Sequence, residues 1–136
     1  MTHVATTYGF GTTLDMPYAD AIERTKEALK AEGFGVLTEI DIRKTLKEKI
    51  DVDVADYVIL GACNPQLAHR ALQAEPEIGL LLPCNVVVYA EGERRSRVAV
   101  MDPDAALGIV DNPAIKPIAA EARERLERAV ASLDRR

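Results

Sequence analysis

Two cysteines, each followed by asparagine, are the residues of this chain whose chemistry is easiest to place. As neighbouring thiolates, Cys63 and Cys84 would be soft ligands for zinc or another soft metal, and His69 or Glu39 would complete the coordination set. As a redox pair they would form a reversible disulfide, with Asn64 and a helix start favouring the Cys63 thiolate. The third alternative is that both are small buried hydrophobic residues, a common role of free cysteine.

The residues around the cysteines predict a strand, a helix and a second strand. The apolar run 57–62 is typical of a strand inside a sheet, and 84–89 has the same character. Asn64 followed by Pro65 predicts a helix that begins directly after the first of these strands. If the two strands are antiparallel neighbours, Cys63 and Cys84 meet at one edge of the sheet, whereas a parallel arrangement separates them. The pattern alone leaves both arrangements open.

Local signals place the remaining elements. Residues 3–14 predict a first strand, with Gly9 and Gly11 marking a bulge. Asp15 and Pro17 indicate the start of a long helix that Gly33 ends in a left-handed cap. Further along, we expect strands at 34–41 and 96–101, short helices at 42–50 and 103–109, a hairpin turn at 90–95 and a final helix whose regular part follows Pro117.

The short helix at 42–50 carries a basic patch in an acidic chain. Ile42, Leu46 and Ile50 lie on one side, and the other sides hold Arg43, Lys44, Lys47 and Lys49. A solvated helix exterior explains such a pattern by default. The alternative is contact with an anion, such as a small phosphorylated or carboxylated ligand, and Lys49 is the candidate residue for it.

Length and composition limit the class of protein. A chain of 136 residues fits one domain, 1–136, and 48% hydrophobic with 29% charged residues is ordinary for a globular protein. The sequence has no membrane-spanning run and no signal-peptide pattern, and its two cysteines indicate a reducing compartment, so we expect a cytoplasmic protein. A net charge of −5 and few aromatic residues argue against nucleic-acid binding.

Two stretches resemble the signature of the domain-of-unknown-function 302 family: the run 59–65, ILGACNP, and the run 80–89, LLLPCNVVVY. Glu39-Ile40-Asp41 and the lysine-bearing helix after it are also similar, so the resemblance covers nearly the whole chain. It implies an α+β fold of the TATA-binding-protein-like class, with a curved, mainly antiparallel sheet of about five strands and helices packed on one face. The order β-α-β-β-α-β-β-α fits that class. The resemblance favours antiparallel neighbours for the two cysteine strands, but brings no established activity.

Three functions follow as hypotheses. The first is a small-ligand or metal-binding module at Cys63, Asn64, Cys84 and Glu39. The second is a homodimeric structural or interaction domain with buried cysteines, because Leu37, Val87 and other apolar residues lie on both faces of the expected strands. The third is a thiol-dependent enzyme or redox protein. The sequence lacks G-x-S-x-G, H-E-x-x-H and glycine-rich nucleotide-binding motifs, so catalysis has no specific support and stays undecided.

Overall fold

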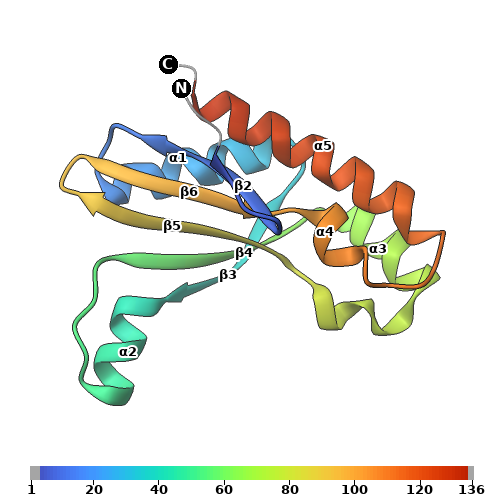
Figure 1. The fold of residues 1–136 in the computed structure, drawn as a ribbon, viewed down its shortest axis with the longest axis horizontal. Helices are drawn as coiled ribbons and strands as arrows, with labels where there is room; N and C mark the ends of the chain where they lie inside the picture. The colour runs from blue at the N-terminus through green and yellow to red at the C-terminus, as the bar shows by residue number, and fades with distance from the viewer. Residues whose placement is uncertain (1–3, 135–136) are drawn as a thin grey trace.

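Six strands form one open antiparallel sheet in the order β1-β2-β6-β5-β4-β3 (Figure 1). The structure, a computed structural model, describes residues 4–134. The strands are β1 (Val4–Ala5), β2 (Gly9–Leu14), β3 (Gly35–Asp41), β4 (Tyr57–Cys63), β5 (Cys84–Gly92) and β6 (Arg95–Met101). The helices are α1 (Tyr18–Ala31), α2 (Ile42–Ile50), α3 (Pro65–Ala74), α4 (Pro103–Leu107) and α5 (Ile115–Leu133), with a 3-10 helix at Pro76–Leu81. The expected α+β fold is confirmed.

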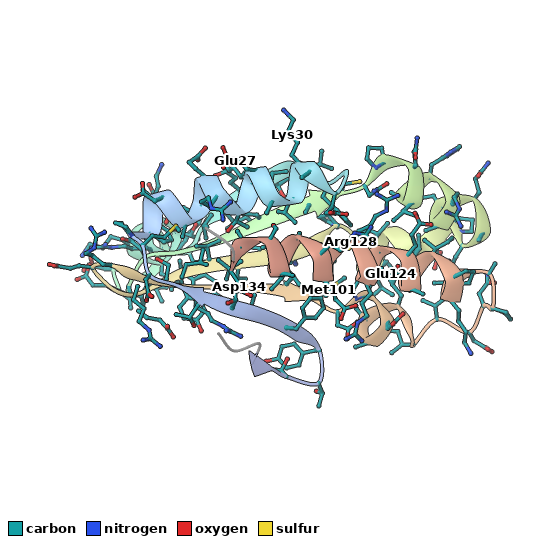
Figure 2. The ribbon with its side chains drawn as sticks, turned by 90° about the horizontal axis from the view of Figure 1, so that it is seen from above. Glu27, Lys30, Met101, Glu124, Arg128 and Asp134 are labelled. Atoms are coloured by element: carbon teal, nitrogen blue, oxygen red, sulfur yellow. The ribbon has the colours of Figure 1, made fainter. Side chains whose placement is uncertain are left out.

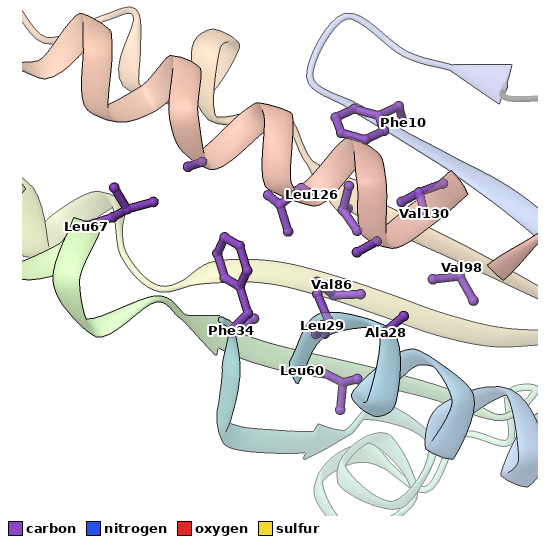
Figure 3. Packing of buried hydrophobic residues seen from close by; sticks show 14 of the residues in the cluster. Phe10, Ala28, Leu29, Phe34, Leu60, Leu67, Val86, Val98, Leu126 and Val130 are labelled. Carbon is purple, nitrogen blue, oxygen red and sulfur yellow. The ribbon is translucent and has the colours of Figure 1, made fainter. Parts of the chain in front are cut away.

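Alternation along the strands gives the sheet one buried face. Leu60, Val86 and Val100 are cross-strand partners in neighbouring strands, so their side chains point to the same side. All three are almost completely buried. Val58, Val88 and Val98 form the next such row. This face is the floor of the hydrophobic core (Figure 3).

The two long helices cover this same face, as their apolar stripes require. α1 and α5 lie side by side above the sheet, with Glu27 and Lys30 of α1 directed to solvent (Figure 2). Leu29 of α1 and Leu126 of α5 are buried against the strands. Burying a leucine of this kind stabilises a fold by about 1.5–3 kcal/mol. The two long helices therefore share one core on one face of the sheet, as the family resemblance implies.

Local signals at the helix ends are also confirmed. α1 is followed by Gly33 at φ +85°, and the Asn64 and Asp102 side chains accept hydrogen bonds from the first turns of α3 and α4.

Pro117, expected to precede the regular helix, instead lies inside the first turn of α5. The first-turn N–H groups of a helix have no partner within it, so proline is tolerated there. No side chain caps α1, whose N-cap is Pro17.

The prediction of one strand over residues 3–14 is wrong where the structure describes it. The chain forms a hairpin, β1 and β2, in which the Thr6 N–H donates to the Gly9 carbonyl at 2.9 Å. The expected bulge at Gly9 and Gly11 is absent too, since the ladder from β2 to β6 is continuous over residues 9–14. Glycine is required at position 11 for a different reason, because a Cβ there would overlap the Val98 carbonyl oxygen.

α2 stands apart from the other helices (Figure 1). None of the residues of α2, which the structure describes in full, is buried. Among the strands and helices, its main contacts are with β3 and β4, at the edge of the sheet. Its apolar stripe thus has little to pack on within this chain. Among residues 4–134, no helix has the length and apolar character needed to cross a membrane.

Candidate functional site

An apolar pocket of about 290 Å³ lies where β4 ends and β5 begins. Cys63, Asn64 and Cys84 all line it, so the structure brings together three of the residues that the sequence singled out. Leu67 of α3 and Ile118 of α5 contribute to its apolar wall. We call it the Cys63–Cys84 pocket.

The chain between the cysteines folds as the sequence predicts. Strand β4 ends at Cys63, and the Asn64 Oδ1 accepts a hydrogen bond from the Leu67 N–H at 3.1 Å. α3 then leads into the 3-10 helix, and a cis Leu82–Pro83 bond precedes β5. The small side chains of Ala68 and Ala71 on α3 leave room between this helix and the sheet end. The pocket is therefore a product of the turn from strand to helix.

The antiparallel ladder places both cysteines at one end of the sheet. Its last pair joins Ala62 to Cys84, so Cys63 is one residue beyond that pair. Because successive side chains of a strand alternate in direction, Cys63 leaves its strand toward the face opposite Cys84. Both thiols are free, Cys84 buried and Cys63 half-buried. The two residues therefore lie at the same end of the sheet, but they form no disulfide and the expected cysteine pair is not supported.

Burial keeps both thiols protonated. It raises the pKa of Cys63 above its ordinary value, and burial together with the nearby Cys63 raises the pKa of Cys84 to about 11. The sequence suggested the reverse for Cys63, namely a thiolate favoured by the start of α3. Loss of water around the sulfur outweighs that local field. At neutral pH the pocket therefore presents two uncharged S–H groups.

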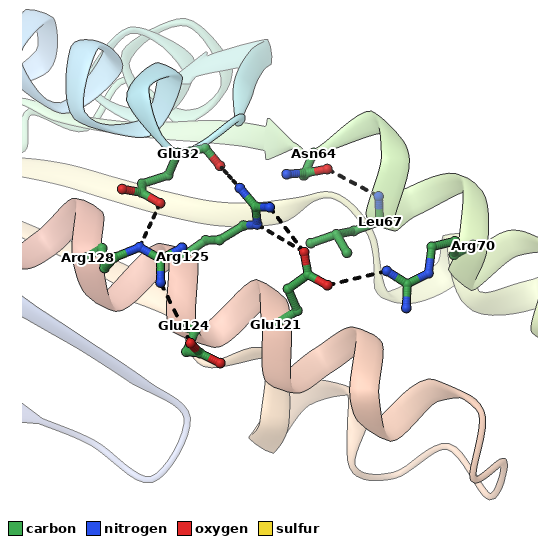
Figure 4. Close-up of polar contacts among 8 residues, drawn as sticks. All are labelled: Glu32, Asn64, Leu67, Arg70, Glu121, Glu124, Arg125 and Arg128. Carbon is green, nitrogen blue, oxygen red and sulfur yellow. Dashed lines mark hydrogen bonds and ion pairs between the residues drawn. The ribbon is translucent and has the colours of Figure 1, made fainter.

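A polar network holds the pocket's outer helices together (Figure 4). Arg125 of α5 donates from Nη1 to the Glu32 carbonyl oxygen at 3.3 Å and from Nε to Glu121 at 3.2 Å. Glu121 also pairs with Arg70 of α3 at 3.4 Å. The hydrogen bond from Arg125 is the main reason that the pKa of Glu121 is lowered. This network ties the end of α1 to α3 through α5, and so fixes the pocket walls.

The other candidate residues lie elsewhere. Glu39, on β3, accepts a hydrogen bond from Lys26 at 2.6 Å, and this contact raises the pKa of Lys26. Lys49 is exposed on α2, and His69 is exposed on α3. None of Glu39, Lys49 and His69 lines the Cys63–Cys84 pocket.

The described residues also contain no group of three or more His, Cys, Asp or Glu side chains placed to hold a metal ion. Cys63, Cys84 and His69 are thus not assembled as the suggested metal set. The exposed position of His69 on α3 is the physical reason, because it directs the imidazole toward solvent.

Several wall residues were not foreseen from the sequence. Phe34, Leu82 and Ile118 come from three distant parts of the chain. Their apolar character predicts burial, but it carries no information about a shared cavity. The one usable signal is the run of small residues on α3, which leaves space beside larger neighbours.

An open antiparallel sheet with its long helices on one face defines the class of fold. Over residues 10–133 the chain matches the family described as Domain of unknown function DUF302, and it belongs to this family. A crystal structure of an uncharacterized conserved DUF302 protein from Bacillus stearothermophilus is 34% identical and superposes with a TM-score of 0.84. The match covers 93% of this chain and 98% of that chain. No curated protein matches the chain.

Proposed function

We propose that this domain binds a small, mainly apolar molecule in the Cys63–Cys84 pocket. The observation that carries the proposal is an apolar pocket of about 290 Å³ into which two thiols and one carboxamide face. Small-molecule sites commonly measure about 300–1,000 Å³ and combine apolar walls with a few polar groups. A cavity of about 150 Å³ accepts benzene, so a ring system of indole size is the expected upper range.

The state of the thiols supports a ligand rather than thiol chemistry. With the pKa of Cys84 near 11, its thiolate is scarce at neutral pH, and nucleophilic or redox reactions need the thiolate. A protonated thiol behaves as a small hydrophobic group with a weak donor. Asn64 supplies the stronger polar contact, although its Oδ1 already accepts from Leu67. The pocket therefore suits an apolar body with one hydrogen-bonding group.

Indole is a suitable probe, with binding followed by saturation-transfer NMR. Ala68→Phe places a ring in the pocket and is expected to abolish indole binding. Ala120→Phe is the matched control, because Ala120 is an exposed alanine on α5 that does not line the pocket. Failure of the native protein to bind indole at millimolar concentration, or equal binding by Ala68→Phe, would contradict the proposal.

A second candidate function is assembly as a homodimer, favoured by the β3 edge of the sheet, which adjoins the pocket at Leu37. Strand β3 is the outer edge of the sheet, and all of its residues except Val36 are exposed. Leu37 and Ile40 on this strand, and Ile50 and Val52 at the end of α2, are large apolar residues left in solvent. An exposed strand edge also leaves backbone N–H and C=O groups available for pairing.

A second copy of the chain is the partner that this edge fits. Two β3 strands related by a two-fold axis run antiparallel, so the backbone N–H and C=O groups of one edge can pair with those of the other. The cationic residues of α2 also attract the remaining, acidic surface of another copy. The net charge of −5 supports a protein partner over nucleic acid. The free thiols fit a reducing compartment such as the cytoplasm.

Light scattering at micromolar concentration tests this candidate. We expect a dimer mass for the native chain and a monomer mass for Leu37→Lys, which puts a charge at the edge. Leu80→Lys is the matched control, because Leu80 is even more exposed, at 85%, and lies on the 3-10 helix. A monomeric native chain would overturn the candidate, and a Leu37→Lys dimer would place the interface elsewhere.

A further inference from the structure

A second hollow, of about 730 Å³, lies mainly on the sheet face turned away from the long helices. Its lining includes Tyr57, Tyr89, Val87, Arg97 and Ala99. On each of these three strands the intervening residues point into the core, as the buried Val58, Val88 and Val98 do. The hollow shares no lining residue with the Cys63–Cys84 pocket.

One row of long side chains crosses this face. Tyr57 is the partner of Tyr89, Tyr89 is the partner of Arg97, and Arg97 is the partner of Thr13. Partners in adjacent antiparallel strands point to the same side and stand about 4.5–5.5 Å apart. The two tyrosine rings are parallel within 7°, with centroids 5.3 Å apart. The row therefore forms a wall of two aromatic rings and one guanidinium.

The next row gives the hollow its floor. Val87 and Ala99 are partners two residues along β5 and β6, and both side chains are short. Because the valine and alanine side chains are shorter than those of the tyrosines and the arginine, they form a flat apolar surface beside the wall. Asn85 and Met101 stand on the far side of this floor. A flat ligand can lie on the floor with its edge against the wall.

Arg97 gives the hollow its positive charge. Arg95 and Glu91, also at its margin, are paired with each other at 3.3 Å. A guanidinium has five N–H donors in a planar fork, enough to bind a carboxylate while keeping a contact within the protein. Burial and the neighbouring Tyr89 and Tyr8 raise the pKa of Tyr57, so its hydroxyl stays a neutral donor. The wall thus offers donors to an anion.

We propose that this hollow is a binding site for a flat aromatic carboxylate. The apolar ring system lies on Val87 and Ala99, the carboxylate accepts hydrogen bonds from Arg97 and the tyrosine hydroxyls, and a polar group at the other end contacts Asn85. The site is independent of the Cys63–Cys84 pocket and does not rest on its function.

The test uses 6-hydroxy-2-naphthoate as the probe and its neutral carboxamide as the matched ligand, titrated by calorimetry into the native chain. Arg97→Gln should weaken binding of the carboxylate about tenfold or more, since hydrogen bonds between charged groups are the strong ones. The same variant should change the affinity for the carboxamide less than about twofold. Arg97→Lys keeps the charge without the fork and should lose part of the affinity. Tyr89→Leu should weaken both ligands, because both lie against its ring.

Arg94→Gln is the control for net charge, because Arg94 is exposed on the same hairpin and does not line the hollow. It should leave both affinities unchanged, and circular dichroism of each variant checks that the fold is kept. The proposal is overturned if the native chain does not bind the naphthoate at millimolar concentration, or if Arg97→Gln binds it as well as Arg94→Gln does. It is also overturned if Ala68→Phe, which fills the other pocket, removes the binding.

Discussion

Cys84 is the ladder partner of Ala62, one residue out of step with Cys63. This offset directs the two sulfur atoms toward opposite faces at the end of the sheet. Both cysteines nevertheless line the same pocket, where β4 ends and β5 begins. The two thiols therefore differ in exposure and in acidity, although each is followed by an asparagine.

The first prediction is that the two thiols differ in reactivity. Alkylation by iodoacetamide requires the thiolate, and Cys63 is half-buried whereas the pKa of buried Cys84 is about 11. At pH 8 we expect Cys63 to be modified first, with the Cys84 rate still rising up to about pH 11. Mass spectrometry of peptides, with Cys63→Ser to isolate Cys84, measures both rates. Equal rates at pH 8 would contradict the assignment.

The second prediction links Cys84 to stability at high pH. Below about pH 8.5 the thiol is protonated in both folded and unfolded chains, so its contribution is complete. As the pH rises from there to about 11, the unfolded chain loses the proton and the folded chain keeps it, so stability falls. Relative to Cys84→Ala, the native free energy of unfolding should drop by on the order of 2–3 kcal/mol across this window. Urea titrations of both proteins measure it, and a constant difference would refute the linkage.

The third prediction concerns the turn after α1. Gly33 has φ +85°, and a Cβ there would lie 3.0 Å from the Asn64 Nδ2. Gly33→Ala should therefore destabilise the chain by about 1 kcal/mol or more, measured by urea unfolding. Gly35→Ala is the control, because a Cβ at Gly35 meets nothing within 4 Å. If the two variants are equally stable, the left-handed turn is not strained by a side chain.

The fourth prediction separates the two Cys-Asn pairs. Asn64 caps α3 and lines the pocket, while Asn85 is exposed on β5. Asn64→Ala should cost about 1 kcal/mol of stability, as loss of a helix cap usually does. Asn85→Ala should change stability by less than about 0.5 kcal/mol, the usual range for surface positions. Thermal unfolding of both variants decides the point, and an equal loss would show that the cap is not the stabilising contact.

The sequence alone determined the features that depend on near neighbours in the chain. The turn at Gly33 and the caps at Asn64 and Asp102 require only a few adjacent residues, so their signals are complete within one turn. The strands β3 to β6 were located by the same logic, because apolar runs and alternation are local, whereas the hairpin of β1 and β2 was not foreseen. The family resemblance then supplied the antiparallel arrangement of β4 and β5.

Tertiary structure decided what depends on the partner of each element. A one-residue change of register exchanges the faces of a strand, so only the ladder could separate Cys63 from Cys84. The Cys63–Cys84 pocket needs Phe34, Leu82 and Ile118 to converge from distant segments, and apolar character does not encode that meeting. Glu39, Lys49 and His69 fell outside the pocket because charge and residue type predict chemistry but not distance. The apolar stripe of α2 is visible in the sequence, but only the structure shows that this helix lies at the sheet edge and buries none of its residues.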